Sequence, residues 1–307
     1  MKKLFLLFLV IISVNSHAQV ILSSTIQNLK GEPLPYANIM IQNQPYGTSS
    51  NIYGFFEISI PYSLLNDTII ISSVGYESKK MGLSELKEKT YLSAQIIMLP
   101  EIIISSSIKE DKTIILNKFK KRNCFMRHQP DYRVDSTSYL PYRQDQPNIE
   151  AIYFPENLKY QGKRIKEVWI YTTSYSVPSY FRLRIFSSSS HLPAHDMLIE
   201  SRIIEVKSPY ELVKIKLEES IIYYPSNGLF IGMEVLIIPD NKCDMVVKDQ
   251  HIPIYSPFMN FTKAKNKMEY WIYANGDWQY REHISEGIYF NKSKKDYNPA
   301  ISLILSN

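Results

Sequence analysis

The residues best suited to metal chemistry are His191 and His195, with Asp196 directly after them. Zinc sites in proteins commonly combine imidazole nitrogens with a carboxylate. A helix would place both rings on one face, but Pro193 lies between the two histidines and disfavours a helix. The serine run at 187–190 just before them is typical of a loop. We therefore predict a solvated loop between two strands and no metal site.

Nucleophilic chemistry would need a cysteine or serine beside a base. Cys124 and His128 lie four residues apart, yet nothing in the sequence orients the imidazole, so we interpret them as a helix end beside a linker. The sequence lacks the motifs of serine hydrolases, zinc peptidases, P-loop proteins and dinucleotide-binding proteins. The sequence thus predicts no catalytic residue and no cofactor. A peptide or glycan hydrolase, with its site in the C-terminal part, is the alternative.

Aromatic residues offer a different chemistry, the binding of sugars. The face of a ring stacks on the apolar C–H patch of a sugar, while nearby polar groups hydrogen-bond its hydroxyls. Residues two apart on a strand share a face, which brings together Trp169 with Tyr171, Trp271 with Tyr273, and Trp278 with Tyr280. We predict these aromatic residues as ligand-binding residues. The alternative is that the rings are cross-strand pairs or parts of a core.

Alternating strand patterns occupy residues 150–307 and position these aromatic residues. Phe181, Leu183 and Ile185 alternate with Arg182 and Arg184, so apolar and charged side chains point to opposite faces. Asn275-Gly276, between two aromatic-rich runs, supplies the positive φ angles of a type I′ hairpin turn. About eight or more strands without helices predict a β-sandwich or jelly roll.

The N-terminal part shows a second set of strand patterns. Residues 31–76 hold three runs rich in β-branched and aromatic residues, separated by turns. The turn glycines are Gly31, Gly47, Gly54 and Gly75. For Gly47 and Gly54 we expect a positive φ, because the chain reverses direction there. The stretch predicts a small antiparallel β-domain.

Three motifs in this stretch carry a family resemblance. The order GEPLPYANI, then GTSSNIYGFFEI, then IIISSVGY resembles the carboxypeptidase-regulatory-like domain over residues 19–105. The resemblance implies a seven-stranded Greek-key β-sandwich of transthyretin-like type, common in exported proteins of Bacteroidetes. It also implies a non-catalytic accessory module. More weakly, FRLRIF and NGLFIGME in the C-terminal part are similar to jelly-roll modules of adhesin and carbohydrate-binding type.

Residues 106–149 are expected to form a short helix and a linker between the two domains. Asp111 can cap a helix over 108–127, and basic residues crowd its far end. We interpret the helix as packed on one sandwich; the alternative is a basic amphipathic helix on a membrane or partner. Cys124 and Cys243 are the two cysteines. Whether they pair in a disulfide or stay free is left open by the sequence.

The N-terminus has the pattern of a signal peptide. Two lysines precede an apolar run at 4–14 and a small-residue site that ends at Ala18. We predict cleavage after Ala18 and export to the periplasm or the outer-membrane surface, with a retained anchor as the alternative. No later segment is apolar enough to span a membrane as a helix. The net charge of +5 over 307 residues is too weak and scattered to indicate nucleic-acid binding.

Together these observations predict an exported, non-enzymatic envelope protein in four parts. These are a signal peptide (1–18), an accessory sandwich (19–105), a connecting segment (106–149) and a jelly-roll-like sandwich (150–307) that binds a glycan or a protein partner. Besides the hydrolase, a docking component of an outer-membrane transport or secretion system is an alternative.

Overall fold

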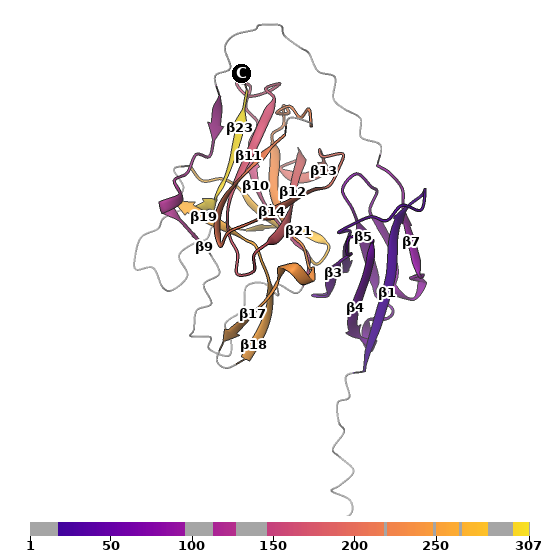
Figure 1. The fold of residues 1–307 in the computed structure, drawn as a ribbon. Coiled ribbons are helices and arrows are strands. Elements are labelled where there is room, and N and C mark those ends of the chain that lie inside the picture. The colour runs from indigo at the N-terminus through magenta and orange to yellow at the C-terminus, as the bar shows by residue number, and fades with distance from the viewer. Residues whose placement is uncertain are drawn as a thin grey trace, which may run out of the picture.

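The computed structural model describes residues 18–95, 113–126, 146–217, 220–247, 250–263, 266–281 and 297–306. The predicted signal peptide, except its last residue Ala18, and most of the predicted linker lie outside these ranges. The described chain is all-β and forms two lobes that lie side by side in Figure 1. Its only helical elements are 3₁₀ turns of three residues, so no helix among the described residues could cross a membrane.

The N-terminal lobe is a sandwich of a three-stranded and a four-stranded sheet, ordered β4-β1-β7 and β3-β2-β5-β6. Its strands are β1 (Gln19–Asn28), β2 (Asn38–Ile41), β3 (Gly47–Ser49), β4 (Phe55–Pro61), β5 (Thr68–Ser72), β6 (Lys79–Gly82) and β7 (Lys89–Leu92). In β4, Phe56, Ile58 and Ile60 are buried while the residues between them are exposed, as expected of a strand with one face on the core. The predicted seven-stranded sandwich is confirmed.

The C-terminal lobe is a second sandwich, made of two seven-stranded sheets and a separate hairpin. The first sheet has the order β13-β12-β16-β10-β20-β21, with β14 paired to β12. Its strands are β10 (Asn148–Phe154), β12 (Ser179–Ser189), β13 (Leu192–Asp196), β14 (Arg202–Val206), β16 (Leu229–Val235), β20 (Tyr270–Ala274) and β21 (Asp277–Arg281).

The second sheet has the order β22-β19-β11-β23-β8, with β15 paired to β11 and β9 to β19. Its strands are β8 (Ile114–Leu116), β9 (Cys124–Met126), β11 (Ile165–Thr173), β15 (Tyr210–Lys216), β19 (Phe258–Lys263), β22 (Tyr297–Pro299) and β23 (Ile301–Leu305). The longer strands β10, β11, β12, β15, β16, β19, β20 and β23 alternate between the sheets in chain order. This alternation is the one that a jelly-roll-like sandwich requires.

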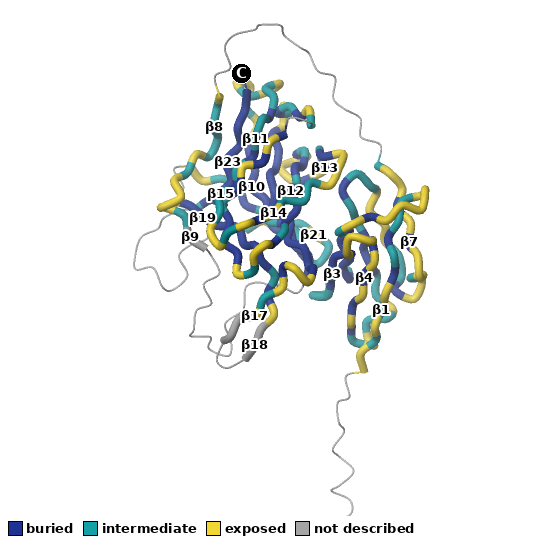
Figure 2. Tube along the Cα trace, viewed as in Figure 1, coloured by how far each residue is buried: buried dark blue, intermediate teal, exposed yellow. Residues whose placement is uncertain are grey.

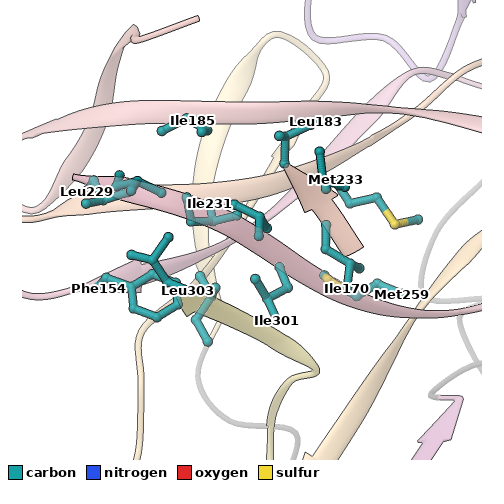
Figure 3. Close-up of a cluster of buried hydrophobic side chains, with 14 of the residues drawn as sticks. Phe154, Ile170, Leu183, Ile185, Leu229, Ile231, Met233, Met259, Ile301 and Leu303 are labelled. Atoms are coloured by element: carbon teal, nitrogen blue, oxygen red, sulfur yellow. The ribbon is translucent and has the colours of Figure 1, made fainter. Parts of the chain in front are cut away.

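The core of the C-terminal lobe fills the space between its two sheets, as the burial colouring of the trace shows (Figure 2). Leu183 and Ile185 of β12 and Ile231 of β16 face Ile170 and Ile301 of the opposite sheet (Figure 3). Because these residues alternate with polar ones along their strands, each strand contributes one face to the core.

The connecting segment corrects one prediction. The described residues 113–126 form no α-helix; they form β8, a 3₁₀ turn at Lys121–Asn123, and β9. Strand β8 pairs with β23, and β9 pairs with β19, so this part of the predicted linker belongs to the second sandwich. Its start, Ile114-Ile115, is β-branched and suits a strand at the open edge of a sheet.

The turn residues follow the predictions with one exception. Positive φ angles are found at Gly31 (84°), Gly54 (75°), Gly75 (82°), Asn275 (56°) and Gly276 (90°). Gly47 instead begins strand β3 and is not among the residues with positive φ. Its lack of a side chain serves packing, since a Cβ there would lie 2.7 Å from Cδ of Pro147.

The two cysteines are free thiols on β9 and on β17 (Lys242–Val247), which forms the separate hairpin with β18 (Gln250–Tyr255). Cys124 donates to the carbonyl of Lys120 at 3.5 Å, and Cys243 to that of Ile254 at 3.6 Å. Burial raises the pKa of both thiols, that of Cys124 to about 11.

We expect Cys124 to react slowly with iodoacetamide while the protein is folded. With a pKa of about 11, roughly one thiol in a thousand is a thiolate at pH 8. In urea-unfolded protein the ordinary thiol pKa of about 8.5 applies, so alkylation should be at least about a hundredfold faster. Mass spectrometry of quenched samples measures both rates. Equal rates at pH 8 would contradict a buried thiol.

Candidate functional site

The site is built on the side of the first sheet that faces away from the sandwich core, called the outer face below. In β12, Leu183 points to the core and its neighbours Arg182 and Arg184 point outward. In β20, Ile272 points to the core and its neighbours Trp271 and Tyr273 point outward. The outer face carries two groups: an aromatic cluster on β10, β12, β16, β20 and β21, and an ion cluster on β12, β13 and β16.

The aromatic cluster consists of Tyr153, Phe186, Phe230, Trp271, Tyr273, Trp278 and Tyr280. Its base is fully buried, with Tyr153 and Phe230 stacked at 4.7 Å between ring centroids. On this base lie two cross-strand pairs of the β20–β21 hairpin, Trp271 opposite Tyr280 and Tyr273 opposite Trp278, each at 5.3 Å. The hairpin therefore adds a layer of aromatic rings to the outer face.

Both interpretations of the hairpin aromatics find support in this arrangement. The rings are cross-strand pairs, and Trp278 also meets Phe186 edge-on at 5.3 Å, so they stabilise the sheet. They are also accessible: Trp271, Tyr273 and Trp278 are half-buried, and Tyr280 is 43% exposed. Binding of a ligand by these residues stays a prediction.

Trp169 and Tyr171 do not belong to this group. They lie on β11 in the opposite sheet, where their neighbours Val168 and Ile170 point into the core. The Trp169 ring lies under the Lys214 ammonium at 4.4 Å, and its indole N–H donates to Glu167 Oε2 at 2.6 Å. The structure thus places the predicted aromatic residues on the outer sides of two different sheets.

A polar pair borders the aromatic cluster. Glu269, just before β20, accepts the indole N–H of Trp271 at 3.3 Å and lies 3.4 Å from His191 Nδ1. His191 sits in the β12–β13 turn with a φ of 61°, and its ring lies 5.3 Å from that of Tyr153. The turn therefore brings His191 to the edge of the aromatic cluster.

The structure corrects the predicted loop around His195. The segment after the turn is the short strand β13 and not a plain loop. Asp196 binds the Arg184 guanidinium at 2.6 Å, and the backbone N–H of His195 donates to the Ser187 hydroxyl at 3.2 Å. Across the described ranges, no group of three histidine, cysteine or acidic side chains could hold a metal ion.

The ion cluster consists of Arg182, Arg184, Asp196 and Glu234; all but Arg184 are buried, and the Arg184 side chain is 13% exposed. Glu234 lies between the two arginines, with Oε1 at 2.9 Å from Arg182 and Oε2 at 2.5 Å from Arg184. The formal charges of the four side chains cancel. Burying charged side chains costs free energy unless each charge is paired and hydrogen-bonded.

The N-terminal lobe completes the hydrogen bonding of the ion cluster. The Asn38 side-chain amide donates to Glu234 Oε1, and the Arg182 guanidinium donates to the Tyr36 carbonyl. Burial alone would raise the pKa of Glu234, but Arg182 and Arg184 outweigh it and hold this pKa below its ordinary value. Glu234 is therefore ionised throughout the neutral pH range.

Glycines allow the two lobes to approach closely. A Cβ at Gly75 would lie 2.3 Å from the carbonyl oxygen of Ile199, and one at Gly276 would lie 2.8 Å from Ile70 Cδ1. Next to Gly75, Val74 packs into the hydrophobic core cluster of the second sandwich. Because these contacts leave no room for a side chain at either glycine, the surfaces of the two sandwiches are closely packed against each other.

We expect Gly75→Ala to destabilise the protein more than Gly31→Ala. Both glycines have nearly the same φ, 82° and 84°, so the backbone strain of an alanine, about 1 kcal/mol, is shared. Only Gly75 faces a backbone atom of the other lobe, whereas Gly31 has no heavy atom within 4 Å. Overpacking adds about 1–3 kcal/mol, visible as a lower melting temperature. Equal melting temperatures of the two variants would contradict this close packing.

Several residues of the outer face are missing from the sequence predictions. Tyr153, Phe186 and Phe230 form the base of the aromatic cluster, and Glu269 borders it. For Arg182 and Arg184 of β12, strand alternation predicts only that they point away from the apolar face, and Glu234 is not among the predicted residues. The ion cluster does have a signal in the sequence, an Arg-x-Arg pattern in one strand and a glutamate in another. Charges of opposite sign pair across neighbouring strands, as those of β12 and β16 do here.

Comparisons with known proteins agree with the N-terminal assignment. Residues 24–104 match the family of the CarboxypepD_reg-like domain. One of the similar solved structures contains the cysteine protease and lectin-like domains of Cwp84, a surface layer associated protein of Clostridium difficile. The TM-score is 0.32 at 11% identity, and the match covers 52% of this chain and 32% of that one. The chain thus spans about a third of that structure's length.

A search of curated proteins found no match. The family match covers the motifs at Gly31–Ile39, Gly47–Ile58 and Ile69–Tyr76 and confirms the resemblance seen in them. Residues 24–104 are a CarboxypepD_reg-like domain, which a further β-rich region follows.

Proposed function

We propose that this is an exported, non-enzymatic protein of the bacterial envelope that binds carbohydrate on the outer face of its second sandwich. The N-terminal domain serves as a structural accessory that covers the ion cluster. The aromatic cluster beside it is the binding surface. The signal-peptide pattern of residues 1–18 supports export.

The observation that carries the proposal is the pair of aromatic cross-strand contacts on the β20–β21 hairpin. Trp271, Tyr273 and Trp278 are half-buried on a rigid aromatic base, so they are fixed in place and still accessible. Rigid aromatic residues bind with little loss of conformational entropy. Polar groups lie at the edge of the rings, as sugar recognition requires: the Glu269 carboxylate and the His191 imidazole.

Retention of the chain from Gln19 onward in gels containing polysaccharides tests the proposal. A panel of soluble β-glucan, mannan, xylan, chitin oligosaccharides and polygalacturonate covers neutral and acidic sugars. We expect at least one polysaccharide to slow migration, with no release of reducing ends during long incubation. Migration unchanged by every polysaccharide would refute carbohydrate binding, and release of reducing ends would show a hydrolase instead.

A further inference from the structure

We infer that Glu269 is the polar anchor of the site and selects neutral sugars over acidic ones, an inference that rests on the proposed carbohydrate binding. The Glu269 side chain is 36% exposed, and its carboxylate accepts the indole N–H of Trp271. A sugar stacked on that indole would therefore place its hydroxyls within reach of the Glu269 oxygens. No sequence motif marks this residue; its role follows from its neighbours in space.

The position of Glu269 is fixed on both sides. Its backbone carbonyl accepts the Tyr153 N–H at 2.9 Å, which ties the residue to strand β10. Its Oε2 accepts the Trp271 indole N–H at 3.3 Å, and its Oε1 lies 3.4 Å from His191 Nδ1. Because the carboxylate is pre-oriented, a ligand does not have to order it on binding.

The carboxylate also retains free hydrogen-bonding capacity. An ionised carboxylate accepts about four hydrogen bonds; the Trp271 indole N–H supplies one, to Oε2, and His191 Nδ1 lies 3.4 Å from Oε1. One lone pair on each oxygen is left for a hydroxyl donor. Two hydroxyls on adjacent carbons of a sugar ring match this pair of acceptors, and each bond would be charge-assisted.

The charges near the aromatic cluster disfavour an acidic ligand. Glu269 borders Trp271, and Asp277 lies on the hairpin beside Tyr273. Burial raises the pKa of Tyr273, Arg184 lowers it, and the Asp277 carboxylate raises it to a smaller extent. The Arg184 guanidinium lies 4.7 Å from the centroid of the Phe186 ring, but its charge is paired with Asp196 and Glu234 in the ion cluster. A uronic acid or another anionic sugar would meet repulsion from unbalanced carboxylates.

Glu167 supplies a matched control within the same chain. It lies two residues before Trp169 and accepts that indole N–H, just as Glu269 does for Trp271. Glu167 is on the opposite sheet, away from the aromatic cluster. Changing each glutamate to glutamine removes one negative charge and keeps the shape of the side chain and its acceptor oxygen.

The test compares wild type, Glu269→Gln and Glu167→Gln on the same polysaccharide panel, with melting temperatures to check folding. We expect wild type to bind neutral polysaccharides more tightly than polygalacturonate. Glu269→Gln should weaken binding to neutral sugars at least about tenfold, because hydrogen bonds to an ionised carboxylate are stronger than those to a neutral amide. Glu167→Gln should bind like wild type.

The outcomes separate this inference from the proposed function. If wild type binds a neutral polysaccharide and Glu269→Gln binds it equally well, the anchor role is refuted and carbohydrate binding stands. Preference of wild type for polygalacturonate would likewise overturn the charge selection alone. If wild type binds none of the polysaccharides, both the proposed carbohydrate binding and the anchor role of Glu269 are refuted.

Discussion

Replacing Arg182 with methionine is expected to lower the free energy of unfolding by about 3–5 kcal/mol. Arg182 and Glu234 are each 0% exposed and lie 2.9 Å apart. Methionine fills much of the arginine volume but leaves Glu234 with one guanidinium instead of two. The substitution also removes the donor to the Tyr36 carbonyl, so it weakens the contact between the two lobes.

Urea unfolding measures this effect, and two further variants sharpen it. Arg202→Met, at a half-buried arginine of β14, should change the free energy of unfolding by less than about 1 kcal/mol. The double variant Arg182→Met with Glu234→Met should be more stable than the sum of its single changes predicts, because no unpaired carboxylate remains. If Arg182→Met unfolds at the wild-type urea concentration, the ion cluster does not stabilise the fold.

Trp271→Ala is expected to weaken carbohydrate binding by at least about 2 kcal/mol, or about thirtyfold. The ring contributes stacking area beside the Glu269 anchor, and its loss also removes the indole N–H that the Glu269 carboxylate accepts. Trp169→Ala removes an equally large ring, on the opposite sheet, and should leave binding unchanged. Calorimetric titration with the best-retained polysaccharide measures both affinities.

If Trp169→Ala weakens binding more than Trp271→Ala does, the ligand does not bind on the outer face of the first sheet. If Trp169→Ala abolishes binding while Trp271→Ala preserves it, the second sheet carries the site. The melting temperature of each variant must be compared with wild type, because Trp271 also packs against Phe230 at 6.4 Å between ring centroids. A thermally stable Trp271→Phe variant provides a milder test of the same ring.

Local patterns were enough to predict most of the fold. The alternation of Phe56, Ile58 and Ile60 with polar residues marks β4, and the same period marks β12. Asn275-Gly276 predicted its hairpin because few other residue pairs adopt the required φ angles. These features depend on neighbouring residues, so the sequence determines them directly.

The errors arose where distant parts of the chain decide the structure. Residues 113–126 carry a helix-like apolar pattern, but pairing with β19 and β23 makes them strands. Gly47 was expected to turn the chain, whereas its actual constraint is the ring of Pro147, about a hundred residues away in sequence. Tertiary contacts of this kind leave no local signature.

The candidate site was predicted in part for the same reason. Strand alternation correctly assigned a shared face to Trp271 and Tyr273, and the hairpin turn joined them to Trp278 and Tyr280. It could not assign strands to sheets, so Trp169 was grouped with residues that lie on the opposite side of the sandwich. Strand alternation also predicted that Arg182 points away from the core. It could not predict that the N-terminal domain covers this side chain.

The most direct test of carbohydrate binding on the outer face uses the three tryptophans of the chain. Their indole N–H groups give separate signals in an ¹H–¹⁵N correlation spectrum, which single Trp→Phe variants assign. On titration with the best-retained neutral polysaccharide fragment, we expect the signals of Trp271 and Trp278 to shift and that of Trp169 to stay in place. A shift confined to Trp169, or no shift of any indole signal under saturating ligand, would contradict the proposed site.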